Sequence, residues 1–204
     1  MIGHLAGFML INLVRIFSGI IIRCKSDDYL QGNAVFFANH TSHLDAMAIL
    51  AALPGSLRRQ VHPVAGLDYW QKNALRRFIA KNVLHCVLID RRRAGAGSFR
   101  QMTALLKEGD SLLIFPEGTR REDGNIGEFR SGMALLSDLV PEQRFIPVYL
   151  AGLSRTLPKG EYLPAPNMSK LFFGEALTRR KDESRDDFTA RCRQALQDLS
   201  GEIK

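Results

Sequence analysis

The residues best suited to chemistry stand in one short stretch, from Asn39 to Asp45, where an apolar run gives way to a helical pattern. With His40 in the loop and Asp45 in the first helical turn, the carboxylate can reach back towards the imidazole. A carboxylate bonded to one ring nitrogen fixes the tautomer, which leaves the other nitrogen to take a proton from a hydroxyl. The stretch therefore indicates general-base chemistry at His40, supported by Asp45.

The same letters allow a purely structural interpretation. Ser42 and Asp45 have the spacing of a helix-capping pair, in which the carboxylate complements the helix dipole. His43 is a second candidate base, but it lies two positions from Asp45, and on a helix this spacing points the side chains apart. The spacing leaves catalysis and capping both open, and it favours His40 over His43 as the base.

Two clusters that could bind an anion follow later apolar runs. Arg91 comes after the run at 83–89, and the turn Pro116-Glu117-Gly118-Thr119-Arg120 follows the run at 111–115. A guanidinium can hold a phosphate by two hydrogen bonds, and a turn whose glycine permits close approach adds backbone amides. A solvated basic turn is the alternative for Arg91, and the better interpretation of Arg92 and Arg93.

Short β-rich runs alternate with helical patterns along the chain, which predicts an α/β fold. We expect a mostly parallel central sheet flanked by helices, with the three clusters at the carboxyl edge of the sheet. Strands are predicted at 34–38, 61–65, 83–89, 111–115, 145–150 and 170–174, and helices at 42–52, 67–81, 98–107, 131–139 and 184–199. A loop rich in proline and glycine is expected at 152–167.

Length and composition set the outer limits. The 204 residues suffice for one domain with a sizeable core, and 46% hydrophobic residues exclude a disordered chain. Three widely spaced cysteines favour a reducing compartment over a disulfide framework or a zinc site. The net charge of +7 requires an anionic partner, for which nucleic acid, a phosphorylated ligand and an acidic lipid surface are the candidates. The sequence contains no Walker, GxGxxG or GxSxG signature.

The N-terminal residues 1–24 are expected to form a separate amphipathic helix ahead of the domain at 25–204. The apolar stretch at 5–22 is interrupted by Asn12, Arg15 and Ser18, and a spanning helix needs roughly 20 mainly apolar residues. A helix lying in the membrane interface, with Arg15 and Arg23 at the headgroups, is one interpretation. A helix that caps the core of its own domain is the other.

In order and spacing, these motifs resemble the glycerolipid acyltransferase family that contains bacterial 1-acylglycerol-3-phosphate acyltransferases. The NHxSxxD block looks like Asn39 to Asp45, and the FPEGTR block is present in full from Phe115 to Arg120. The block formed by an apolar strand that ends in arginine looks like Leu84 to Arg91, with His85 where the family usually has glycine. Two shorter elements are similar to Phe129-Arg130-Ser131-Gly132 and Phe145-Ile146-Pro147-Val148.

The resemblance implies acyl transfer from acyl-CoA or acyl carrier protein to the sn-2 hydroxyl of 1-acylglycerol-3-phosphate, giving phosphatidic acid. It implies His40 and Asp45 as the catalytic pair, and it assigns substrate binding to Arg91, Glu117, Gly118, Thr119 and Arg120. It implies neither a metal nor a redox cofactor, because the thioester already supplies an activated acyl group. The enzyme is then expected as a peripheral or monotopic protein at the cytoplasmic face of the inner membrane.

Two alternatives stay open, and a third is not favoured. The acceptor could be a lyso-ornithine lipid, a lysophospholipid with a headgroup or glycerol 3-phosphate. From another class, a non-catalytic module that binds anionic lipid would explain the basic charge without using His40. Nucleic-acid binding is suggested by the charge alone and lacks a recognisable motif or interleaved aromatic residues, so no nucleic-acid partner is expected.

Overall fold

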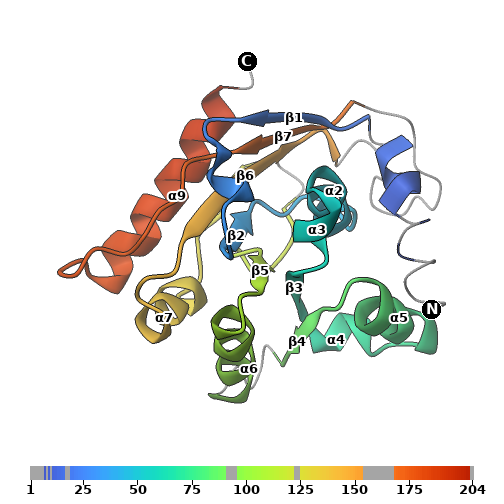
Figure 1. The fold of residues 1–204 in the computed structure, drawn as a ribbon, viewed down its shortest axis with the longest axis horizontal. Coiled ribbons are helices and arrows are strands. Elements are labelled where there is room, and N and C mark those ends of the chain that lie inside the picture. Colours follow the sequence, from blue (N-terminus) through green and yellow to red (C-terminus); the bar gives the residue numbers. More distant parts are fainter. Residues whose placement is uncertain are drawn as a thin grey trace.

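The structure is a computed structural model that describes residues 7, 9, 11–16, 19–90, 96–121, 125–153 and 168–202. Its centre is a seven-stranded sheet in the order β1-β7-β6-β2-β5-β3-β4 (Figure 1). Neighbouring strands run parallel except β6 and β7, which are antiparallel. The expected α/β fold with a mostly parallel sheet is confirmed. The strands are β1 (Ile21–Cys24), β2 (Val35–Ala38), β3 (Val61–Gly66), β4 (Val87–Ile89), β5 (Ser111–Ile114), β6 (Phe145–Ala151) and β7 (Lys170–Phe173).

Helices cover both faces of the sheet. Figure 1 shows α6, α7 and α9 on one face, with α2 and α3 on the other. The helices are α2 (Asp45–Ala52), α3 (Gly55–Arg58), α4 (Leu67–Trp70), α5 (Ala74–Phe78), α6 (Ala96–Lys107), α7 (Gly132–Leu139) and α9 (Arg185–Gly201). A short 3-10 helix, η1 (Asp27–Leu30), and a π-helical turn, η2 (Ile79–Val83), complete the described elements.

The central strand β2 explains why its sequence is an unbroken apolar run. Val35 and Phe37 pack into the core under α6, α7 and α9, whereas Phe36 and Ala38 pack into the core under α2. All four side chains are fully buried, as expected for a parallel strand covered on both faces. The two cores fix β2 firmly, and therefore fix the loop that leaves its carboxyl end.

One predicted helix is wrong in its extent. The segment at 67–81 is divided into α4, α5 and the start of η2. The helix breaks at Gln71 and Lys72. Asn73 then caps α5, because its side chain accepts a hydrogen bond from the backbone amide of Arg76 at 2.8 Å. Because η2 extends to Val83, the strand predicted at 83–89 is shortened to β4. His85, between η2 and β4, has a φ of 50°, a conformation that glycine adopts most easily.

The N-terminal segment differs from the expected single helix. Residues 11–16 are helical, but Ile21–Cys24 forms β1 and pairs with β7. In the helix Ile11 and Val14 are buried, whereas Met9, Leu13 and Ile16 are exposed. One stripe thus caps the core, and a second apolar stripe faces outwards. The helices within the described ranges all fall short of the length and apolarity that crossing a membrane requires.

The two N-terminal arginines have partners within the domain. The Nε of Arg15 donates to the carbonyl of Ala51 at 2.9 Å, near the C-terminal end of α2. The guanidinium of Arg23 lies 5.6 Å from the ring centre of Phe172 in β7. These contacts tie both side chains to the fold, so the fold itself accounts for their presence.

Candidate active site

The site forms at the carboxyl edge of the sheet, where β2 and β5 end side by side. His40 follows β2 by two residues, and the Nδ1 of its ring lies 2.8 Å from the Oδ2 of Asp45 at the start of α2. The predicted pair is therefore formed. Its neighbour Asn39 is buried and exchanges two hydrogen bonds with the backbone of Leu150 in β6, which anchors the loop before His40.

Asp45 is completely buried, yet its carboxylate is well satisfied. Oδ2 accepts hydrogen bonds from the backbone amides of Thr41 at 2.6 Å and Ser42 at 2.8 Å, in addition to the contact with His40. A carboxylate oxygen only accepts, so the hydrogen bond to Oδ2 of Asp45 requires the ring proton of His40 on Nδ1. The structural and catalytic interpretations of Asp45 are thus compatible, because one side chain organises the loop and orients the imidazole.

The second ring nitrogen of His40, Nε2, has no hydrogen-bond partner among the described residues. The ring stacks on Phe115 at the end of β5, with ring centres 4.2 Å apart and planes 22° from parallel. The side chain of His40 is 20% exposed, which leaves it within reach of a ligand. A neutral imidazole held by Nδ1 and presenting an open Nε2 can accept a proton from a hydroxyl.

The side chain of Glu117 links the loop after β2 to its own loop after β5. Its Oε1 accepts from the backbone of His40 at 3.0 Å, and its Oε2 accepts from the backbone of Gly127 at 3.2 Å. Burial raises the pKa of Glu117, while these two hydrogen bonds act in the opposite direction. The resemblance assigned this side chain to substrate binding, which stays a prediction; in the described structure both oxygens accept from the protein's own backbone. In the described contacts Glu117 is a brace between the loops after β2 and β5.

The glycine of the FPEGTR turn is required by its surroundings. Gly118 has a φ of 71°, and its amide donates to the carbonyl of Phe115 at 3.0 Å. A Cβ atom built on Gly118 would lie 2.6 Å from the Nε of Arg130. The turn and the Phe129-Arg130-Ser131-Gly132 element are therefore packed together, with a guanidinium lying directly on the turn.

The remaining predicted residues are placed as follows. Thr119 and Arg120 are exposed, and the amide of the next residue, Arg121, donates to the carbonyl of His40 at 2.9 Å. Arg120 thus leaves the turn immediately beside the His40 loop. Arg91 lies outside the described residues. Groups of histidine, cysteine, aspartate and glutamate that could hold a metal are absent from the described part of the chain.

A stack of side chains that the sequence did not predict lies beside the base. His43 stacks on Tyr69 with ring centres 5.0 Å apart, and the guanidinium of Arg76 lies 4.3 Å from the ring centre of Tyr69. Partial burial lowers the pKa of His43, and the charges of Arg120, His40 and Arg76 lower it further. Tyr69 and Arg76 carry no motif, and only the long-range stack reveals that they belong near the site.

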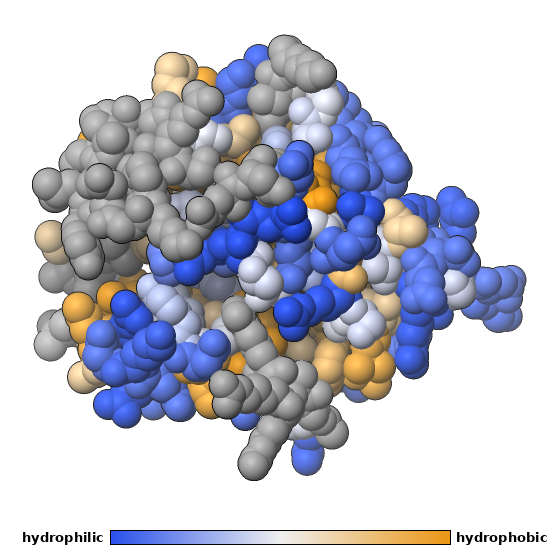
Figure 2. Space-filling model, turned by 180° about the vertical axis from the view of Figure 1, so that it is seen from behind, coloured by the Kyte–Doolittle hydropathy of each residue, from blue (hydrophilic) through white to orange (hydrophobic). Residues whose placement is uncertain are grey.

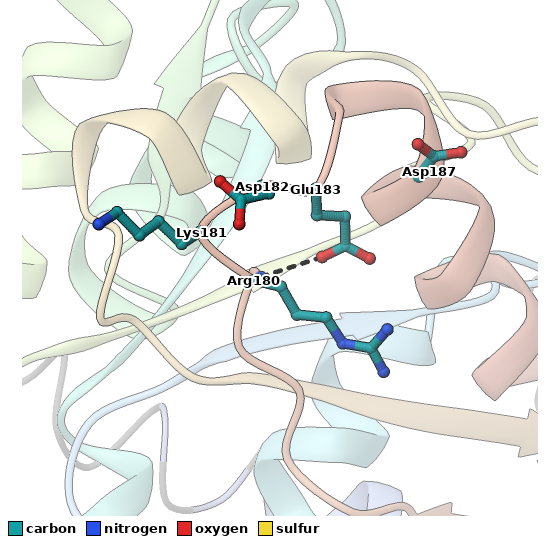
Figure 3. Close-up of a pocket in the computed structure, with 5 residues that line it drawn as sticks. All are labelled: Arg180, Lys181, Asp182, Glu183 and Asp187. Carbon is teal, nitrogen blue, oxygen red and sulfur yellow. Dashed lines mark hydrogen bonds between the residues drawn. The ribbon is translucent and has the colours of Figure 1, made fainter.

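A hollow of about 400 Å³ lies elsewhere, before α9. It is lined by Arg180, Lys181, Asp182, Glu183 and Asp187, and in Figure 3 Arg180 and Lys181 point in different directions. Glu183 accepts from the backbone of Arg180 at 3.1 Å, and both its oxygens bond Arg191 at 2.7 Å. The ion pair between Glu183 and Arg191 thus lies at this hollow, which none of the predicted site residues lines.

The chain is similar to proteins of one family. The acyltransferase family model matches residues 21–150, a range that begins at β1 and contains the His40, Asp45 and Glu117 loops. Among curated proteins, 1-acyl-sn-glycerol-3-phosphate acyltransferase of Limnanthes douglasii is 27% identical over 174 residues, which cover 81% of this chain and 57% of that protein. The chain thus spans little more than half the length of this relative.

Bacterial relatives carry related names. A probable 1-acyl-sn-glycerol-3-phosphate acyltransferase of Mycoplasma pneumoniae is 30% identical over 128 residues, covering 61% of this chain and 47% of that protein. The crystal structure of the 1-acyl-sn-glycerophosphate acyltransferase PlsC from Thermotoga maritima has a TM-score of 0.73 and 19% identity, covering 97% of this chain and 81% of that one. At this identity, the structural likeness establishes the fold alone.

Proposed function

Because this chain belongs to the acyltransferase family, we propose that it acylates the sn-2 hydroxyl of 1-acylglycerol-3-phosphate to give phosphatidic acid. The observation that carries the proposal is the buried Asp45 carboxylate bonded to Nδ1 of His40, whose Nε2 has no partner within the described part of the chain. The names of the plant and bacterial relatives support the choice of acceptor. Acyl-CoA or acyl carrier protein is the proposed acyl donor.

The reaction needs one proton to move twice. Nε2 of His40 takes the proton of the acceptor hydroxyl as its oxygen attacks the thioester carbonyl carbon. The carbon–sulfur bond then breaks, and the imidazolium returns the proton to the leaving thiolate. Asp45 stabilises the transient imidazolium through Nδ1. General-base catalysis of this kind supplies about 10²- to 10⁴-fold in rate, and holding the two substrates in line supplies much of the remainder.

Positive charge at the same edge suits a phosphomonoester acceptor. Arg120 is exposed beside the His40 loop, and Arg130 lies on the Gly118 turn. In this proposal Arg120 holds the glycerol phosphate with help from Arg91, while Gly118 and Thr119 shape the turn that receives it. Glu117 contributes by fixing the turn against the backbone of His40. The thioester brings its own activation, so the proposed reaction uses no metal or redox cofactor.

We also propose that the protein works at a membrane surface, on the cytoplasmic side where acyl-CoA is present. Most of the coloured surface in Figure 2 is hydrophilic, and hydrophobic side chains gather there in small separate patches. Against this background the N-terminal helix exposes an apolar stripe at i, i+4 and i+7, formed by Met9, Leu13 and Ile16. Such a stripe can enter the boundary between headgroups and acyl chains.

An acceptor panel tests the proposed reaction. The purified protein is given radiolabelled acyl-CoA with lysophosphatidate, glycerol 3-phosphate, lyso-ornithine lipid or lysophosphatidylcholine, each in mixed micelles, and the panel is repeated with acyl carrier protein as donor. We expect the highest kcat/KM with lysophosphatidate. If only another acceptor is turned over, that acceptor is the substrate and the proposal of lysophosphatidate is wrong. If no combination of donor and acceptor gives turnover, the acyltransferase proposal is rejected.

Vesicle binding tests the membrane proposal separately. Leu13→Glu should reduce co-sedimentation with vesicles of anionic lipid, because it places a charge in the exposed stripe. Leu139→Glu is a matched control, since Leu139 at the end of α7 is 47% exposed and Leu13 is 49% exposed. Equal loss of vesicle binding in both variants would contradict a role for this helix.

A further inference from the structure

We infer that Arg76 is a phosphate-binding residue of the acyl-transfer site, held in place by a stack of aromatic rings. Its guanidinium lies 4.3 Å from the ring centre of Tyr69, and that ring stacks in turn on His43, three residues after His40. The inference deepens the proposed function and rests on it. It adds a cation that lies outside every recognised motif of the sequence.

The position of Arg76 follows from the topology. Strands β2, β5 and β3 are neighbours, and each delivers a basic group past its carboxyl end: His40 after β2, Arg120 after β5, and Arg76 in α5 after β3. The stack between His43 and Tyr69 joins the first and third of these loops. Arg76 is therefore brought to the same edge as the proposed base by contacts between side chains.

The charge on Arg76 is available to a ligand. The side chain is only partly exposed, and within the described ranges it forms no ion pair with a carboxylate. The charges of Arg76 and Arg120 both lower the pKa of His43, and the Arg76 guanidinium is linked to that imidazole through the ring of Tyr69. A guanidinium at this edge of the sheet, with no carboxylate partner among the described residues, is suited to bind a phosphate.

The contact with the Tyr69 ring explains how the guanidinium of Arg76 can be held in one position although α5 is a short helix. A guanidinium stacked on a tyrosine ring loses little further freedom when it binds an anion. Tyr69 is then a positioning residue, and its ring rather than its hydroxyl is the part that matters. Trp70, the single tryptophan of the chain, lies edge-on to Tyr69 with ring centres 5.4 Å apart, so its fluorescence can report on events at the stack.

The bound phosphate could belong to the acceptor headgroup or to the CoA donor, and kinetics distinguishes these sources. Arg76→Gln should raise KM about tenfold for one of the two substrates, the scale expected for a charged hydrogen bond, with kcat nearly unchanged. If the acceptor is bound, KM rises for lysophosphatidate. If the donor is bound, KM rises for acyl-CoA but not for acyl-pantetheine, which lacks the phosphates.

Three variants make the test specific. Tyr69→Ala should reproduce part of the rise in KM, whereas Tyr69→Phe, which keeps the ring, should restore wild-type kinetics. Arg77→Gln removes the same charge from the next residue of α5, which is exposed and outside the stack, and should leave both KM values unchanged. Equal effects of the Arg76 and Arg77 substitutions, or unchanged KM values in Arg76→Gln, would overturn the inference.

A binding experiment separates this inference from the proposed reaction. Glycerol 3-phosphate and CoA are titrated into the intact chain while the fluorescence of Trp70 is followed. We expect one of these probes to change the signal, with a dissociation constant about tenfold higher in Arg76→Gln than in Arg77→Gln. If phosphate binding depends on Arg76 but no acyl transfer occurs, the reaction is wrong and the site stands. If acyl transfer occurs but the substitution of Arg76 leaves phosphate binding unchanged, the proposed role of Arg76 is wrong and the proposed reaction stands.

Discussion

Two histidine–aspartate pairs lie at opposite edges of the same sheet. At the carboxyl edge Nδ1 of His40 lies 2.8 Å from Asp45, and at the amino edge Nε2 of His62 lies 3.0 Å from Asp110. By residue type and distance the pairs are nearly equal. They differ in the second ring nitrogen, because Nδ1 of His62 lies 3.0 Å from the carbonyl of His85, whereas Nε2 of His40 has no partner among the described residues.

The comparison teaches that a histidine–carboxylate contact does not by itself make a base. Each ring nitrogen of His62 lies 3.0 Å from an oxygen of the described fold, so both nitrogens face the protein's own groups. The side chain ties the start of β3 to the residues before β4 and β5. His40 has one nitrogen fixed by Asp45 and the other without a partner in the described ranges, at the edge where loops from parallel strands converge.

Substituting the two histidines should give the largest contrast. His40→Ala should lower kcat by about 10²- to 10⁴-fold, since it removes the proposed proton acceptor. His62→Ala should keep kcat and lower the free energy of unfolding by about 1–2 kcal/mol, because two hydrogen bonds are lost. Steady-state kinetics with lysophosphatidate and urea denaturation measure the two effects. Similar losses of kcat in both variants would show that the second pair also serves catalysis.

Two glycines extend the contrast to the backbone. Gly118 at the carboxyl edge and Gly109 before β5 at the amino edge both have positive φ, 71° and 93°. Alanine at either position should cost about 1–2 kcal/mol of stability. Nothing lies within 4 Å of a Cβ on Gly109, whereas a Cβ on Gly118 would displace the guanidinium of Arg130.

Gly118→Ala should therefore reduce kcat/KM by up to about 10²-fold as the turn and Arg130 shift, while Gly109→Ala should leave kcat/KM unchanged. Thermal unfolding and steady-state kinetics on the same preparations separate the two effects. A loss of stability without a loss of activity in Gly118→Ala would mean that the packing of Arg130 on the turn has no part in the reaction.

The sequence predicted those parts of the fold that depend on continuous apolar runs. β2, β3, β5, β6 and β7 were all found close to their expected bounds, because buried parallel strands have a strong local pattern. β1 was missed, since three of its four residues are exposed and its sequence continues the apolar N-terminal segment. The break between α4 and α5 was missed because it depends on a single cap at Asn73.

The site was predictable where one short segment holds both partners, as in His40 and Asp45, five residues apart. It was not predictable where a residue acts through distant contacts. The resemblance assigned Glu117 to substrate binding, and only the structure reveals that its oxygens bond backbone amides 77 and 10 residues away. Tyr69 and Arg76 reach the site through a stack on His43, which no local pattern of residues indicates.

Two glutamates differ in the direction of their pKa shifts. The dependence of stability on pH that follows is the smallest of the expected effects. Burial raises the pKa of Glu117 at the active edge, whereas hydrogen bonds from Arg191 lower the pKa of Glu183 before α9. A carboxyl with a lowered pKa in the folded state binds fewer protons there than in the unfolded chain, so it stabilises the fold above its ordinary value near 4.5. That contribution is lost as the pH falls through the lowered pKa.

Glu183→Gln should thus reduce the free energy of unfolding by about 1 kcal/mol at pH 7, and by progressively less below pH 4.5. Urea denaturation between pH 3 and pH 7 measures the difference from the wild type. Glu142→Gln is the control, because Glu142 is exposed and has no ion pair among the described residues. A deficit in Glu183→Gln that stays constant with pH would assign the effect to packing, since lost charge pairing must disappear once the wild-type carboxyl is protonated.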